Sequence, residues 1–255
     1  SEYSGRSHHF HDPADVGASC TECHMHERTY MVIDPRRDHS IRVPRPDLSD
    51  KLGTPNSCNQ CHDDKTTEWA TNYLVEWFGE YILETDHYGE AFWEGRHGYP
   101  EALPKLADIA TDNSRPSMVR ANAVSLLSNY QDQTVGQVLQ STIRDEDPLI
   151  RYAALSVAQY TDDQAAMNLI VNALDDSVKL VRIMAANAMS RYSQDNLTER
   201  KKAIYEQSLD EYFQSLMINA DHPGTHVNYG NLYLNQGELA KAEASYKEAI
   251  EIEPG

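Results

Sequence analysis

Two copies of one five-residue motif, Cys-x-x-Cys-His, constrain this chain more than any other feature of its sequence. The motif occurs at residues 20–24 (CTECH) and again at residues 58–62 (CNQCH). The chain has 255 residues and 4 cysteines, so the two motifs account for every thiol. No cysteine remains for a disulfide bond or for a free catalytic nucleophile.

This spacing is the attachment signature of a c-type haem. Two thiols three positions apart can reach the two vinyl groups on one edge of the macrocycle, and the histidine that follows can ligate the iron. We therefore predict two haem c groups per chain. The predicted thioether cysteines are Cys20, Cys23, Cys58 and Cys61, and the predicted proximal iron ligands are His24 and His62.

A structural zinc site is the alternative interpretation of the same cysteines, because two Cys-x-x-Cys pairs can build a tetrahedral Cys₄ site. The interval between Cys23 and Cys58 is longer than in a usual zinc ribbon, and a Cys₄ site needs no histidine after each pair. A thioredoxin-like redox motif would need a βαβ pattern nearby, which this sequence lacks. These features favour haem over zinc.

The distribution of histidine supports haem independently. The chain has 11 histidines, most of them close to the two motifs. Each of two irons has a second axial position that histidine can fill. We predict His11 and His39 as the distal ligands, with His8 and His9 as the next candidates.

Prolines and glycines interrupt residues 1–66, which we therefore expect to be loop-rich and to lack a good apolar core. The macrocycles would supply apolar surface there. Arg36 and Arg37 belong to a cluster of arginines in this segment. We interpret them either as partners of haem propionates, which suit the guanidinium fork, or as ordinary surface charge.

A helix is expected to begin after Thr66, where Trp69, Tyr73 and Trp77 recur at every fourth position. Such an aromatic stripe is more typical of a protein core than of a cofactor site. Contact with the second haem is the alternative interpretation.

An internal repeat runs from residue 100 to about residue 192. Similar segments place an arginine at positions 120, 151 and 182, each preceded by an acidic turn and followed by small apolar residues. A fixed period with two helices per unit is typical of an α-solenoid. The pattern resembles short HEAT-like repeats, which implies a scaffold rather than a catalytic domain.

The C-terminal segment resembles a tetratricopeptide repeat (TPR), with Gly230, Gly237, Ala242, Tyr246 and Pro254 at its characteristic offsets. The sequence ends where a next unit would begin. We therefore expect that the protein continues or that this end stacks on another molecule.

Together these patterns predict a mostly α fold, in which a loop-rich dihaem segment precedes an α-solenoid. We expect three domains: a dihaem segment at residues 1–66, HEAT-like repeats at 67–200 and TPR-like helices at 201–255.

Charge and hydropathy exclude several classes of function. The net charge is −18, from 22 basic and 40 acidic residues, which argues against nucleic-acid binding and against docking on anionic lipid by charge alone. The sequence contains no run of 18 or more apolar residues, so it does not predict a transmembrane helix. The polar first residues contain no signal peptide, so we interpret the sequence as mature or trimmed.

Residues 20–64 resemble the paired Cys-x-x-Cys-His region of multihaem cytochromes c that carry HEAT and tetratricopeptide repeats. The segments that carry the resemblance, besides the motifs, are residues 34–40 (DPRRDHS), 44–49 (PRPDLS) and 53–57 (GTPNS). The resemblance implies an exported protein, periplasmic or extracellular. It also implies electron transfer, with histidines such as His39 as axial ligands.

We therefore predict an electron carrier with bis-histidine haems, which exchanges electrons with redox partner proteins. This prediction favours a carrier over an enzyme. One alternative is a subunit of a multihaem redox enzyme with one open haem site. We also expect a homo-oligomer. Head-to-tail association would build an extracellular filament, in which His8, His9 or His11 of the N-terminal arm, the segment before the first motif, would ligate a haem of a neighbour.

Overall fold

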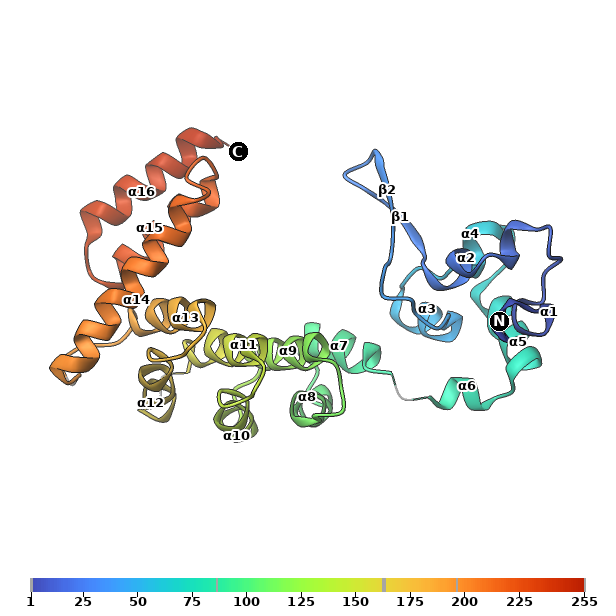
Figure 1. Cartoon of the computed structure of the whole chain (residues 1–255), viewed down its shortest axis with the longest axis horizontal. Helices are drawn as coiled ribbons and strands as arrows, with labels where there is room; N and C mark the ends of the chain where they lie inside the picture. The colour runs from blue at the N-terminus through green and yellow to red at the C-terminus, as the bar shows by residue number, and fades with distance from the viewer. Residues whose placement is uncertain (1, 86, 162–163, 196, 255) are drawn as a thin grey trace. The chain divides into compact units, whose positions relative to one another are not determined.

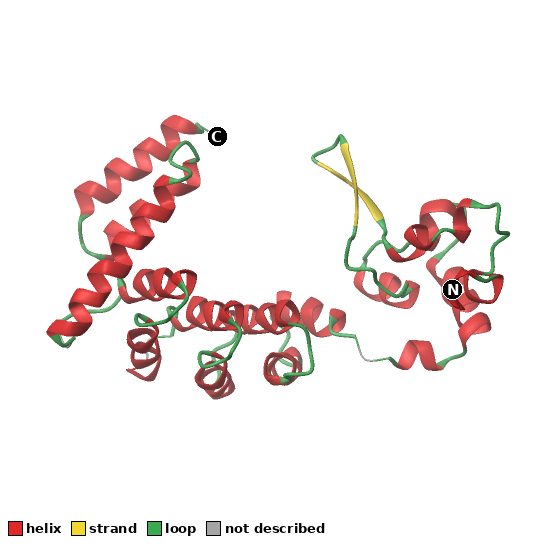
Figure 2. Cartoon of the chain, in the orientation of Figure 1, coloured by secondary structure: helices red, strands yellow, loops and turns green. Residues whose placement is uncertain are grey.

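The computed structural model describes residues 2–85, 87–161, 164–195 and 197–254, and this part of the chain is mostly helical (Figures 1 and 2). It forms two compact units, Ser1–Trp93 and Glu94–Gly255. The domain boundary expected at residue 66 lies inside the first unit. Helix α5 (Thr67–Phe78) belongs there because it packs against helix α3 (Pro46–Leu52).

The first unit consists of short helices and one two-stranded antiparallel hairpin. Its elements are η1 (Glu2–Ser4), α1 (Arg6–His9), η2 (Val16–Ala18), α2 (Cys20–His24), β1 (Glu27–Tyr30), β2 (Asp34–Arg37), α3, α4 (Cys58–Cys61), α5, α6 (Tyr81–Glu84) and α7 (Gly89–Arg96), which crosses into the second unit. Among the prolines expected to prevent long helices, Pro13, Pro44 and Pro55 lie in connections, Pro46 begins α3, and Pro35 lies in strand β2.

Helix α5 is the longest helix of the first unit, and its start was predicted correctly. The Thr66 hydroxyl accepts a hydrogen bond from the Trp69 backbone N–H at 3.1 Å, which is an N-cap. The helix ends at Gly79, whose φ of 88° places it in the left-handed region that glycine tolerates. Ala70 and Leu74 are buried on the helix.

The second unit is a stack of helix pairs. Its helices are α8 (Ala102–Thr111), α9 (Ser117–Leu126), η3 (Leu127–Asn129), α10 (Gln133–Thr142), α11 (Pro148–Ala158), α12 (Gln164–Ala173), α13 (Lys179–Met189), α14 (Glu199–Met217), α15 (Pro223–Asn235) and α16 (Leu239–Ile252). Helices α9, α11 and α13 pack side by side. Helix α8 packs on α9, α10 packs on α9 and α11, and α12 packs on α11 and α13. The predicted solenoid is therefore confirmed.

Small apolar residues allow the inner helices of this stack to approach closely. Ala123, Ala154 and Ala185 occupy equivalent positions in α9, α11 and α13 and are fully buried. Because each helix pair covers its apolar face only by stacking on its neighbours, stability of the unit depends on the array.

An ion pair joins each repeat to an acidic residue further along the stack. The three arginines of the sequence repeat form the pairs Arg120–Asp145, Arg151–Asp176 and Arg182–Glu211, the last two at 2.7 and 2.8 Å. The acidic turns noted in the sequence thus supply the partners of the first two arginines. The first two pairs are nearly buried.

Within the described ranges, no helix combines the length and the apolarity that a membrane crossing requires.

Candidate functional site

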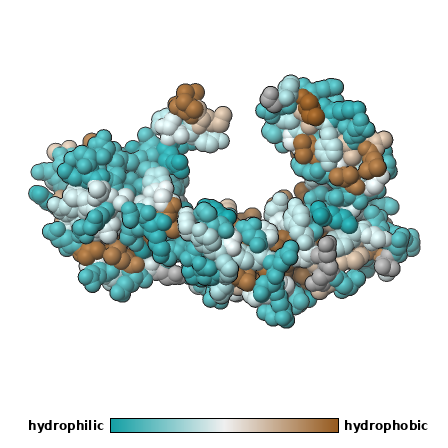
Figure 3. Space-filling model, turned by 180° about the vertical axis from the view of Figure 1, so that it is seen from behind, coloured by the Kyte–Doolittle hydropathy of each residue, from teal (hydrophilic) through white to brown (hydrophobic). Residues whose placement is uncertain are grey.

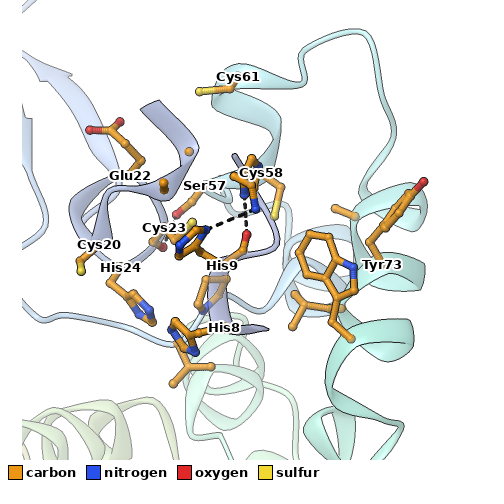
Figure 4. Close-up of a pocket in the computed structure, with 18 of the residues that line it drawn as sticks. His8, His9, Cys20, Glu22, Cys23, His24, Ser57, Cys58, Cys61 and Tyr73 are labelled. Carbon is orange, nitrogen blue, oxygen red and sulfur yellow. Dashed lines mark hydrogen bonds between the residues drawn. The ribbon is translucent and has the colours of Figure 1, made fainter. Parts of the chain in front are cut away.

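The first unit contains a cavity of about 480 Å³ with a mainly apolar lining (Figure 4). This volume lies within the range of roughly 300–1,000 Å³ that is typical of cofactor pockets. Both Cys-x-x-Cys-His motifs line it, together with the N-terminal arm and one face of α5. The predicted site residues that line the cavity are Cys20, Cys23, His24, Cys58, Cys61, His62, His8, His9 and His11.

Each motif folds into a single helical turn, and the two turns lie against each other. Helices α2 and α4 contain the cysteines, and both motif histidines lie at the helix C-terminal ends. The Ser57 hydroxyl donates a hydrogen bond of 2.7 Å to the Cys23 backbone carbonyl. This contact joins the second motif directly to the first.

The histidine of the first motif faces a histidine of the N-terminal arm. The imidazole rings of His24 and His8 have centroids 6.0 Å apart, and their planes differ by 6°. Figure 4 shows the two rings side by side below the motif.

The histidine of the second motif has an equivalent partner. The rings of His62 and His11 have centroids 6.2 Å apart, with planes inclined by 35°. The N-terminal arm therefore supplies one imidazole to each motif, His8 from α1 and His11 from the loop that follows it.

Hydrogen bonds orient one ring of each pair. The Nδ1 atom of His24 lies 2.8 Å from the Arg42 backbone carbonyl, and Nδ1 of His11 contacts the carbonyl of His9. A carbonyl oxygen only accepts hydrogen bonds, so both Nδ1 atoms carry the proton. Their Nε2 atoms are then free to bind a metal, and a backbone carbonyl on the other nitrogen is a frequent companion of metal-ligating histidine.

Aromatic side chains of α5 form one wall of the cavity. Trp69, Tyr73 and Trp77 all line it, and the Trp69 ring lies 4.9 Å from the ring of His62. Phe10 stacks on Trp77 with ring centroids 4.5 Å apart. The aromatic stripe thus faces the candidate site. The favoured interpretation of its spacing was a protein core, and the alternative was contact with a cofactor.

Two thiols of the site are neutral at physiological pH. Burial raises the pKa of Cys58 to about 11, and the nearby Cys23 thiol adds to the shift. Burial likewise raises the pKa of Cys23. Neither thiol is therefore a reactive thiolate, and burial does not oppose their conversion to uncharged thioethers.

Three predicted site residues do not reach the cavity. His39 is exposed in a turn, in which the Ser40 backbone N–H donates a hydrogen bond to the Asp38 carboxylate at 2.9 Å. Arg36 pairs with Asp34, and Arg37 pairs with Glu22 and Glu27. The two arginines thus have carboxylate partners in the protein itself, beside the hairpin and α2.

The zinc interpretation needs several ligands around one point. The described residues contain no cluster of three or more histidine, cysteine or acidic side chains with the geometry to hold a metal ion. The imidazoles are instead arranged in two separate pairs.

Comparison with known proteins identifies the repeats of the second unit. A family model described as HEAT repeats matches residues 137–211, and a model described as tetratricopeptide repeat matches residues 223–255. No curated protein and no solved structure matches the chain. The second unit therefore contains HEAT repeats, from α10 into α14, followed by a tetratricopeptide repeat in α15 and α16.

Proposed function

We propose that this chain binds two haem c groups in the cavity of its first unit and functions in electron transfer. The observation that carries the proposal is the pairing of His8 with His24 and of His11 with His62. Two imidazoles that bind opposite sides of one metal, each through a nitrogen about 2 Å away, have ring centres roughly 6 Å apart. The observed separations of 6.0 and 6.2 Å fit that requirement.

The residues around the two pairs fit the haem as well. The cysteines for thioether bonds precede His24 and His62 in each motif. The aromatic side chains of α5 offer an apolar surface beside the second pair. When bound, haem supplies an iron that gains and loses one electron.

Two histidines per iron favour an electron carrier over an enzyme. An enzyme with an open haem site needs one iron with a single protein ligand, whereas this chain offers two imidazoles at both motifs. Such a carrier exchanges electrons with other redox proteins. As a c-type cytochrome it would be exported to the periplasm or the cell exterior. Head-to-tail association of the exported chains stays a prediction.

Removal of one distal histidine is expected to change the spin state of one iron. His8→Ala should convert about half of the low-spin absorption to high-spin, and His11→Ala should convert the other half, because each removes one strong-field ligand. His39→Ala is the matched control and should leave the spectrum unchanged. Absorption and electron paramagnetic resonance spectra of the haem-loaded chain measure all three. High-spin iron in His39→Ala, or none in the other two variants, would contradict the assignment.

A further inference from the structure

The hairpin of the first unit ends in an exposed apolar tip. Its four consecutive residues, Tyr30, Met31, Val32 and Ile33, are between 57 and 91 % exposed. Figure 1 shows the hairpin projecting from the short helices of its unit, and Figure 3 shows its hydrophobic end. Runs of exposed apolar residues are unfavourable in water and commonly mark interaction surfaces.

The backbone of the tip is strained, because the residues there are not of the types that favour a positive φ. Met31 has a φ of 51° and Val32 a φ of 73°. Glycine and asparagine adopt such left-handed conformations readily, whereas a β-branched valine does so rarely. Bulky apolar side chains thus stand where turn-forming residues would suit the backbone better, which points to a function of the side chains themselves.

Two arginines lie directly opposite each other below the tip. Arg28 of β1 pairs in register with Arg36 of β2, and like charges in this position repel each other. Arg36 contacts Asp34 and lies 5.0 Å from the centre of the Tyr30 ring. Among the described residues, Arg28 has no ion-pair partner. An external anion between the two guanidinium groups would stabilise the hairpin.

We propose that this hairpin inserts its tip into the surface of a phospholipid bilayer, with Arg28 and Arg36 at the level of the lipid phosphates. Three residue-to-residue steps of extended chain lead from Arg28 to Met31, a distance of about 10 Å. Apolar side chains of interfacial segments enter the boundary between headgroups and acyl chains by about 5–10 Å. The two lengths agree.

The order of side chains along the hairpin favours a bilayer over a protein partner. Aliphatic residues form the apex, Tyr30 and its cross-strand partner Asp34 lie next to them, and the arginines lie below, where Arg36 forms an ion pair with Asp34. The polarity of a bilayer changes in the same order, with tyrosine preferred at the interface and arginine at the phosphates. Every phospholipid has a phosphate, so the site does not require an anionic membrane, which the net charge of −18 would repel.

The test compares the full chain with a variant that removes the apolar tip and suits the turn. Met31→Asn with Val32→Gly places two residues there that tolerate positive φ, so the hairpin is expected to fold at least as well. Sedimentation with phosphatidylcholine vesicles at 0.15 M salt should show binding of the native chain. The double variant should bind the vesicles at least about tenfold more weakly than the native chain, because it loses two aliphatic side chains.

A control variant and a second pair of substitutions sharpen the result. Ile218→Asn removes an equally exposed apolar residue, 81 % accessible, from the second unit and should leave vesicle binding unchanged. Arg28→Gln with Arg36→Gln should weaken binding while the tip is intact. No vesicle binding by the native chain, or equal binding by the tip variant, would overturn the proposal. Self-association that disappears in the tip variant, without vesicle binding, would assign the hairpin to a protein contact instead.

Discussion

Replacing Cys58 and Cys61 together with serine is expected to reduce the haem content of the chain from two groups to one. Serine forms no thioether bond, so the second motif keeps its histidines but loses its covalent attachment. The first motif has its own cysteines and its own pair, His8 and His24, and should keep its haem. A pyridine haemochrome assay, combined with the mass of the intact chain, measures the ratio of haem to protein.

The reciprocal variant is the matched control for this prediction. Cys20→Ser with Cys23→Ser should also leave one haem, now at the second motif, and the fourfold variant should leave none. A chain that retains two covalently bound haems after loss of either cysteine pair would contradict the assignment of one haem to each motif. Complete loss of haem in both double variants would show that the two sites form only together.

Arg120→Ala is expected to lower the free energy of unfolding of the repeat unit by roughly 3–5 kcal/mol, the usual effect of breaking a buried ion pair. Arg120 is only 7 % exposed, and it bonds to the Asp145 carboxylate and to the Ala110 backbone carbonyl. The substitution removes the ion-pair partner of the Asp145 carboxylate, which is only 12 % exposed, and the loss of that partner is the main source of the destabilisation. Urea unfolding followed by far-ultraviolet circular dichroism measures the effect.

Arg144 provides the control for this experiment. It is exposed, and it adjoins Asp145 in the sequence, so Arg144→Ala should change the free energy of unfolding by less than about 0.5 kcal/mol. Adding Asp145→Asn to Arg120→Ala should recover part of the lost stability, because the unpaired charge is removed. Equal effects of Arg120→Ala and Arg144→Ala would show that the ion pair does not stabilise the stack.

The repeats were predictable from sequence because their determinants are local and periodic. Arg120, Arg151 and Arg182 recur at one fixed interval, and each is preceded by an acidic turn. Small apolar residues at equivalent positions predicted the helices that pack side by side. The Thr66 N-cap is likewise a local signal, since its hydroxyl satisfies a backbone donor three residues away.

The pairing of histidines could not be predicted in the same way. His39 was favoured because it lies between the motifs in the sequence, yet a local turn holds it away from the cavity. His8 reaches the first motif because the chain folds the N-terminal arm back across it. Phe10 contributes to that path, because its φ of 57° ends α1 and its ring stacks on Trp77. Contacts between such distant segments leave no periodic trace in the sequence.

The aromatic face of α5 shows a related limit. Its spacing predicts one apolar stripe on a helix but does not distinguish a core from a cofactor wall. In the structure Trp69 lies beside His62 and lines the cavity, which supports the interpretation as a cofactor wall. The available signal in the sequence was that residues 1–66 lack a good apolar core of their own for such a stripe to join.

The ratio of covalently bound haem to protein tests the central claim most directly. The chain should be expressed in a host that exports it and attaches haem to Cys-x-x-Cys-His motifs, then purified and assayed as the pyridine haemochrome and by intact mass. The account predicts two haems per chain, both low-spin. A colourless protein whose mass equals that of the polypeptide alone would contradict it.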